Sequence, residues 1–174
     1  ASDPLPDSVH EMLLERLQLY FLVGGMPQAV AVYLQDHSLL EVGRVHESLM
    51  HSYREDINKY RQRLDVEGIE RLLETIPAQA GKQVKYEHLA PDWRIERTKR
   101  ALHLLERILL VSRVQACGAA SLPLGADAHE RRFKYVFLDV GLMRHQCGLS
   151  ADAVLGSRDL LDVLRGSLAE QFVG

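Results

Sequence analysis

The stretch 93-WRIERTKRALHLLERILLVSRVQ-115 decides the expected fold, because a two-faced helix runs directly into a strand. At about 100° per residue, one side of the helix carries uncharged residues: Ile95, Thr98, Leu102 and Leu105. The opposite side carries charged and polar residues: Glu96, Arg100, His103 and Arg107. The pattern predicts a helix over 93–107, capped by Asp92, that buries the first side and turns its arginines toward water.

The segments on both sides of this helix suggest a winged helix. Upstream we expect a helix over 66–76 and a short helix or turn at 84–89. Downstream we expect a strand over 108–115, a loop over 118–131, a second strand over 131–140 and a helix over 141–150. A helix, a short helix, a capped helix and a hairpin follow one another in this way in winged helices. The expected fold class is therefore mainly α, with a winged-helix domain over 64–148 that contains a small antiparallel β-hairpin.

A helical region over 1–63 precedes that domain, and 149–174 is expected to begin a truncated C-terminal domain. In 20-YFLVGGMPQAV-30 we expect a helix, a tight corner at Gly24, Gly25 and Met26, and a second helix that starts at Pro27. Asp7 or Ser8 is expected to cap the first helix. A third helix is expected over 39–60, opened by a capping box of Ser38 and Glu41.

Composition excludes several classes of protein. The chain has 174 residues, 47% of them hydrophobic, and a net charge of −3, which argues for a folded core and against a globally basic protein. Its two cysteines cannot form a disulfide framework, so a cytoplasmic location is expected. No apolar run is long enough for a membrane span, and no signal peptide is visible. Both ends look cut, as in a piece of a longer protein.

Motifs for catalysis or nucleotide binding are not found. The sequence 80-AGKQ-83 lacks the first glycine and the final hydroxyl residue of a phosphate loop, since Ile76 and Gln83 stand there. Asp139, at the end of 135-YVFLDV-140, is expected to cap the next helix. The histidines and cysteines show no metal-ligand spacing. We therefore expect no enzyme activity, no metal and no cofactor in this chain.

Basic residues on the 93–107 helix and on the second strand are the candidate binding residues. They are expected to contact the phosphates of duplex DNA, with Arg94 or Arg97 near the bases, or to dock another protein. Glu96 and Glu130 dilute this charge. The candidates are Arg94, Arg97, Lys99, Arg100, Arg107, Arg131, Arg132 and Lys134.

Several stretches together resemble the domain of unknown function that follows the ATPase core in prokaryotic AAA-superfamily proteins. They are 20-YFLVGGMPQAVAVYL-34, 53-YREDINKY-60, 74-ETIPAQAGKQVKYEHLAP-91, 97-RTKRALHLLERILLVSRV-114 and 133-FKYVFLDVGLM-143. The closing 166-GSLAEQFVG-174 resembles the exit motif of that domain, where a restriction-endonuclease-like domain commonly begins, and Glu170 matches its acidic residue.

The resemblance implies a cytoplasmic ATP-binding parent protein whose ATP and Mg²⁺ site lies upstream of this chain. The first functional hypothesis is a non-catalytic accessory domain that couples the ATPase core to a partner. The alternatives are a winged-helix DNA-binding module and a fragment of a nuclease-like protein. The corner formed by Gly24, Gly25, Met26 and Pro27 either abuts the ATPase core or is a tight turn between helices.

Overall fold

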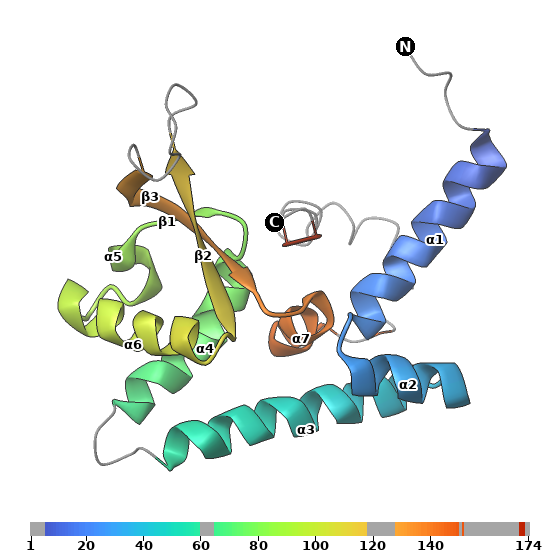
Figure 1. Ribbon diagram of the computed structural model, residues 1–174, viewed down its shortest axis with the longest axis horizontal. Coiled ribbons are helices and arrows are strands. Elements are labelled where there is room, and N and C mark those ends of the chain that lie inside the picture. The colour runs from blue at the N-terminus through green and yellow to red at the C-terminus, as the bar shows by residue number, and fades with distance from the viewer. Residues whose placement is uncertain (1–5, 60–64, 118–127, 150, 152–170, 173–174) are drawn as a thin grey trace.

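The structure is a computed structural model that describes residues 6–59, 65–117, 128–149, 151 and 171–172. The described residues are mainly helical, with one small antiparallel sheet (Figure 1). The helices are α1 (Asp7–Val23), α2 (Pro27–Asp36), α3 (Leu39–Asn58), α4 (Val66–Gln79), α5 (Tyr86–Leu89), α6 (Ile95–Arg107) and α7 (Val140–Gln146). The strands are β1 (Gln83–Val84), β2 (Val111–Cys117) and β3 (Ala128–Phe137).

The first three helices begin largely where the sequence indicates. Pro27 occupies the first turn of α2, and the Ser38 side chain accepts a 3.3 Å hydrogen bond from the Glu41 N–H at the start of α3, so both predictions are confirmed. The predicted cap of α1 is wrong. Pro6 precedes Asp7 at that helix start, and no side chain caps it. Pro6 fixes the entry instead, since its carbonyl accepts from the N–H groups of Val9 and His10.

The predicted hairpin is confirmed, and it belongs to a sheet of three strands in the order β1-β3-β2. Both pairings are antiparallel: Val111 lies opposite Phe137, and Val84 lies opposite Phe133. Strand β1 is not predicted, because two residues are too few to show an alternating pattern. Strand β3 begins at Ala128, within the predicted loop, and positions 118–127 lie outside the described residues.

Strand β2 starts three residues later than predicted, because the chain first unwinds from α6. The N–H of Leu110 reaches back 3.1 Å to the carbonyl of Leu105, and the N–H of Leu109 reaches 3.0 Å to that of Glu106. Leu109 has a φ of 59° and is 70% exposed. These bonds satisfy carbonyls that the end of a helix would otherwise leave without donors.

The larger core lies between α4, α6, the sheet and α7. Most of its fully buried side chains come from these four: Ile69, Leu72, Leu73, Ile76, Leu102, Leu105, Tyr135, Leu142 and Met143. Met50 of α3 and Leu110, which precedes β2, are fully buried in the same core. A second, smaller cluster joins α1, α2 and α3 through Val23, Ala29, Val42 and Val45. The buried side of α6 is Thr98, Ala101, Leu102 and Leu105 as the pattern indicates, whereas Ile95 is 36% exposed at the start of the helix.

Helix α7 contacts helices of the smaller cluster as well as elements of the larger core. It packs against α1 and α3 on one side and against α4 and β3 on the other. Asp139 caps α7, since its Oδ1 accepts a 2.9 Å hydrogen bond from the Leu142 N–H, so that prediction is confirmed. Gln171 also reaches this junction: its Oε1 accepts from the Phe137 N–H at 2.7 Å, and its Nε2 donates to the Phe137 carbonyl at 2.6 Å.

Within the described residues, no individual helix combines the length and the apolar composition needed to cross a bilayer. The pair α1 and α2, bent by 119° at the corner between them, passes that test only when the two are taken together.

Candidate functional site

The candidate binding residues of α6 lie on its outer side, as expected. We call the exposed polar and charged residues of α6 and its N-cap the α6 surface: Arg94, Glu96, Lys99, Arg100, His103 and Arg107. Arg100 and Arg107 are exposed rather than buried, which confirms the predicted orientation of the helix. The α6 surface holds four Arg and Lys side chains and one carboxylate, so it is locally basic on a chain of net charge −3.

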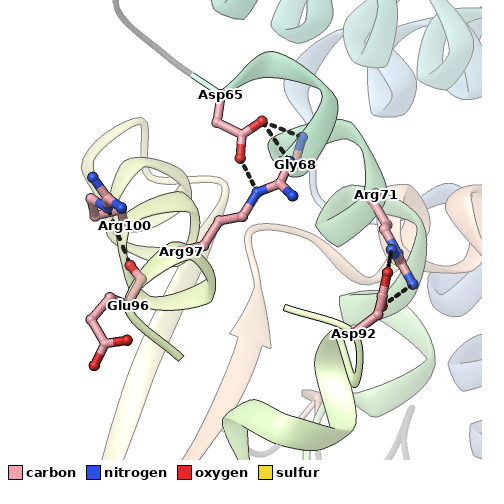
Figure 2. A network of polar contacts seen from close by, with 7 residues as sticks. All are labelled: Asp65, Gly68, Arg71, Asp92, Glu96, Arg97 and Arg100. Atoms are coloured by element: carbon pink, nitrogen blue, oxygen red, sulfur yellow. Dashed lines mark hydrogen bonds and ion pairs between the residues drawn. The ribbon is translucent and has the colours of Figure 1, made fainter. Parts of the chain in front are cut away.

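Arg97 is the candidate residue whose guanidinium is already engaged. Its Nε donates to Oδ2 of Asp65 at 2.5 Å, and a terminal nitrogen donates to Oδ1 at 3.0 Å. The same guanidinium lies 4.0 Å from the ring centroid of Trp93. Figure 2 shows this side chain reaching from α6 to the start of α4. An anion that approached Arg97 would therefore have to compete with a carboxylate in place.

Asp65 performs two tasks at once. Besides pairing with Arg97, its Oδ1 accepts a 3.1 Å hydrogen bond from the Gly68 N–H and caps α4. The Arg97 guanidinium holds the pKa of the Asp65 carboxyl below its usual range, and Asp65 in turn holds the pKa of Arg97 above its own. Both side chains of the pair are about two-fifths exposed, so water screens their attraction and the ion pair adds only a little to the free energy of unfolding. It fixes the start of α6 against the start of α4.

Asp92 does not cap α6, so the predicted cap is wrong. Arg94 occupies the N-cap position, and no side chain caps the helix there. Both carboxylate oxygens of Asp92 instead accept hydrogen bonds of 2.7 Å from Arg71 of α4 (Figure 2). This hydrogen bond lowers the pKa of Asp92. The sequence puts Asp92 at a possible cap position. Its carboxylate turns to Arg71 instead, because a guanidinium can donate hydrogen bonds to both carboxylate oxygens at once.

A cavity of about 680 Å³ lies between α4 and the start of α6. Its lining contains three arginines, Arg94, Arg97 and Arg100, and three carboxylates, Asp65, Asp92 and Glu96. Because these charges balance, the cavity has no net attraction for an anion. Two of the four cations of the α6 surface, Arg94 and Arg100, also line this cavity, whereas Lys99 and Arg107 lie outside it.

The candidate residues of β3 are only partly described. Lys134 is half-buried in the strand, opposite Val114 of β2 and Gln83 of β1. The backbones of Arg131 and Arg132 belong to β3, but their side chains lie outside what the structure describes. Glu170 and Glu130 likewise have no described side chain.

The corner residues contact this chain's own Asp139. Gly24 has a φ of 73°, and a Cβ added there would overlap the Asp139 carboxylate, with 2.8 Å to its Cγ. The N–H of Gly25 donates a 2.6 Å hydrogen bond to Asp139 Oδ2. Met26 is the N-cap of α2, ahead of Pro27. The close approach that the two glycines permit is therefore an approach to the N-terminus of α7.

The two groups with the largest pKa shifts, His46 and Tyr135, are both buried and belong to different parts of the fold. Burial lowers the pKa of His46 to about 4, and its Nε2 donates to the Val23 carbonyl at 3.1 Å. Burial also raises the pKa of the Tyr135 phenol, whose hydroxyl lies 3.2 Å from Glu106 Oε1. Within the described residues, no group of three or more His, Cys, Asp or Glu side chains is arranged to hold a metal ion.

Two polar residues that contact α6, Asp65 and Arg113, are not among the candidates identified from the sequence. Asp65 lies directly before an apolar helical pattern, and Gly68 follows three residues later. This placement is typical of a helix N-cap. Arg113 lies on β2, where its Nε lies 3.4 Å from Glu106 of α6. No local pattern indicates that contact, because it depends on how the strand crosses the helix.

The comparisons with known proteins identify a family without a described activity. A family model described as a domain of unknown function (DUF8612) matches residues 14–153. No curated protein and no solved structure matches the chain. The match runs from the middle of α1 to beyond the end of α7, and therefore contains the corner, Asp139 and the whole α6 surface. Because it covers well over half of the sequence, the chain belongs to the DUF8612 family of domains of unknown function.

Proposed function

We propose that the chain is a non-catalytic accessory domain of an AAA-superfamily ATPase, and that it binds a partner through the α6 surface. The described element order α4, β1, α5, α6, β2, β3, with β3 between the other two strands, supports a winged helix over 64–148. In such an arrangement α6 is the helix that faces a partner. The ATPase setting rests on the resemblance of the quoted stretches, and that resemblance implies an ATP and Mg²⁺ site upstream.

The observation that carries this proposal is the exposure of the basic side chains on α6. Arg94, Lys99 and Arg107 form no ion pair with another described residue, and Arg100 donates only to the backbone carbonyl of Glu96. Exposed cations outside an ion pair remain available to an incoming anion at little desolvation cost. A partner with a negative surface is therefore the class that fits α6.

The test uses the parent protein with two substitutions on the α6 surface, Arg100→Glu and Arg107→Glu. The control is Arg16→Glu on α1, which reverses the charge of another exposed arginine far from α6 along the chain. ATP turnover is measured for each. We expect the α6 double variant to lose the coupling, so that its turnover equals that of a protein lacking residues 1–174. Turnover that is unchanged in both the double variant and the deletion contradicts an accessory role.

Duplex DNA is the second candidate function, as the partner of the same surface. Four Arg and Lys side chains against one carboxylate on the outer side of α6 favour it. Binding of this kind releases counterions, so it weakens steeply as salt rises. Absence of binding to duplex DNA at low salt removes this candidate and leaves the accessory role standing.

A further inference from the structure

A second hollow borders α6 on the side of the sheet. It has a volume of about 460 Å³ and lies between α6 and β2, and we call it the α6–β2 hollow. Leu102 and Tyr135, each 1% exposed, form buried parts of its lining. Its basic residues come from both elements: Lys99 and His103 from α6, and Arg113 from β2. Of these three, Lys99 is among the candidate binding residues from the sequence, and His103 lies on the polar side of the helical pattern.

Glu106 is the one carboxylate among the described residues that line this hollow, and three neighbours already surround it. Its Oε1 lies 3.2 Å from the Tyr135 hydroxyl and 3.4 Å from Arg113 Nε. Its Oε2 lies 3.5 Å from His103 Nδ1. The carboxylate thus holds Arg113 and His103 in place, and Lys99 remains as a charge in excess.

Donors remain available after these contacts are made. Arg113 presents Nε to Glu106, and no hydrogen bond or ion pair with another described residue occupies its terminal nitrogens. The Lys99 ammonium lies 5.3 Å from the centroid of the Tyr86 ring, at the rim of the hollow. The lining of the cavity on the other side of α6 holds as many carboxylates as arginines. The lining of the α6–β2 hollow, with Lys99 and Arg113 against Glu106, instead holds one positive charge in excess.

We propose that the α6–β2 hollow binds a backbone phosphate of duplex DNA, held by Lys99 and by the terminal nitrogens of Arg113. This site rests on the DNA-binding function proposed above and assigns that function a definite contact. A helix inserted in the major groove has a phosphate backbone on each flank, and contacts to these phosphates fix the register of the protein. Glu106 is a positioning residue here, and its own charge opposes the phosphate.

The experiment measures binding of the full chain to a fluorescein-labelled DNA duplex by anisotropy, across a series of salt concentrations. The variants are Lys99→Gln, Arg113→Gln and Glu106→Gln, with Arg44→Gln as the control for loss of one surface charge. We expect each of the two cation variants to weaken binding several-fold and to reduce the slope of log K against log salt by about one unit. Arg44→Gln leaves both unchanged.

Glu106→Gln separates a phosphate site from a structural one. The glutamine oxygen can still accept from the Tyr135 hydroxyl and from Arg113 Nε, so Arg113 keeps its position, but the side chain no longer repels a phosphate. We therefore expect tighter binding than in the unmodified chain. A merely structural role of the cluster would instead weaken binding in all three variants and overturn the proposal. If Lys99→Gln and Arg113→Gln bind DNA as tightly as the unmodified chain, the phosphate site is overturned and the DNA-binding function still stands. No binding by the unmodified chain at low salt overturns it together with the DNA-binding function.

Discussion

The backbone N–H of Gly25 donates a 2.6 Å hydrogen bond to Asp139 Oδ2, across 114 positions of the chain. The other carboxylate oxygen, Oδ1, accepts from the Leu142 N–H and caps α7. One side chain, 7% exposed, thus joins the corner between α1 and α2 to the helix that follows the sheet. Gly24 has a structural reason within this chain, because its φ is 73° and a side chain there would occupy the space of that carboxylate.

The Asp139 carboxylate should therefore stabilise the fold through both oxygens. Asp139→Asn keeps the shape and one acceptor oxygen, but replaces the other oxygen with an NH2 group that cannot accept, so either the Gly25 or the Leu142 N–H loses its partner. We expect a loss of about 1–3 kcal/mol in the free energy of unfolding, the cost of leaving a buried donor without its partner. Urea unfolding measures this loss, with Asp36→Asn at the exposed end of α2 as the control. A loss equal to that of the control would show that the corner does not depend on Asp139.

Two glycines should respond to alanine in opposite directions. Gly24→Ala combines a φ of 73° with overlap on Asp139, so we expect destabilisation of about 2 kcal/mol or more. Gly43→Ala in α3 meets no atom within 4 Å, so we expect stabilisation of about 0.5–1 kcal/mol from helix propensity. Thermal unfolding of both variants checks this pair. Destabilisation of the same size at both sites would contradict the contact with Asp139.

Stability should fall between pH 6.5 and pH 4 because of His46. Its pKa is lowered from 6.5 to about 4, so within this interval the unfolded chain binds a proton that the folded chain does not. Unfolding therefore becomes easier as the pH falls, and the full difference corresponds to about 3 kcal/mol. The pKa of His145 is lowered as well, and its effect has the same sign.

His46→Gln isolates that contribution, because a glutamine amide can still donate to the Val23 carbonyl but does not titrate. Urea unfolding at several pH values should show a smaller decrease in stability for this variant than for the unmodified chain. An identical pH dependence in the two proteins would show that His46 is not the group responsible.

Substitution of Asp65 by serine and by alanine separates its two roles, the cap of α4 and the ion pair with Arg97. Asp65→Ser keeps an oxygen to cap α4 and loses the ion pair with Arg97, whereas Asp65→Ala loses both. We expect alanine to be less stable than serine by about 1 kcal/mol, the usual value of a cap. Arg97→Gln should reduce stability in the unmodified chain and have little further effect in Asp65→Ser. Additive effects of the two substitutions would contradict the coupling between these residues.

The fold was most predictable where a signal is local. The two sides of α6, the capping box at Ser38, the corner before Pro27 and the Asp139 cap all depend on residues a few positions apart, so periodicity and cap chemistry indicate them. The cap at Asp92 was assigned wrongly because a distant residue, Arg71, supplies a better partner. Strand β1 was missed because its two residues are defined only by pairing with β3.

The candidate site was predictable in outline but not in its partners. Helical periodicity placed Arg100 and Arg107 in solvent. It could not show that Arg97 pairs with Asp65, 32 positions away, or that Arg113 crosses to Glu106 from a different element. These contacts depend on the packing of α6 against α4 and β2, which no local pattern encodes. They also determine which charges line the α6–β2 hollow.

The most direct test of the α6 surface is a titration of the isotopically labelled chain with a short DNA duplex, followed by amide NMR shifts. The account predicts shifts concentrated in residues 94–107 of α6 and 111–115 of β2, with the corner at 24–27 unaffected because it is bound to Asp139. Shifts concentrated at the corner, or none on α6 at low salt, would contradict the binding of duplex DNA by this surface.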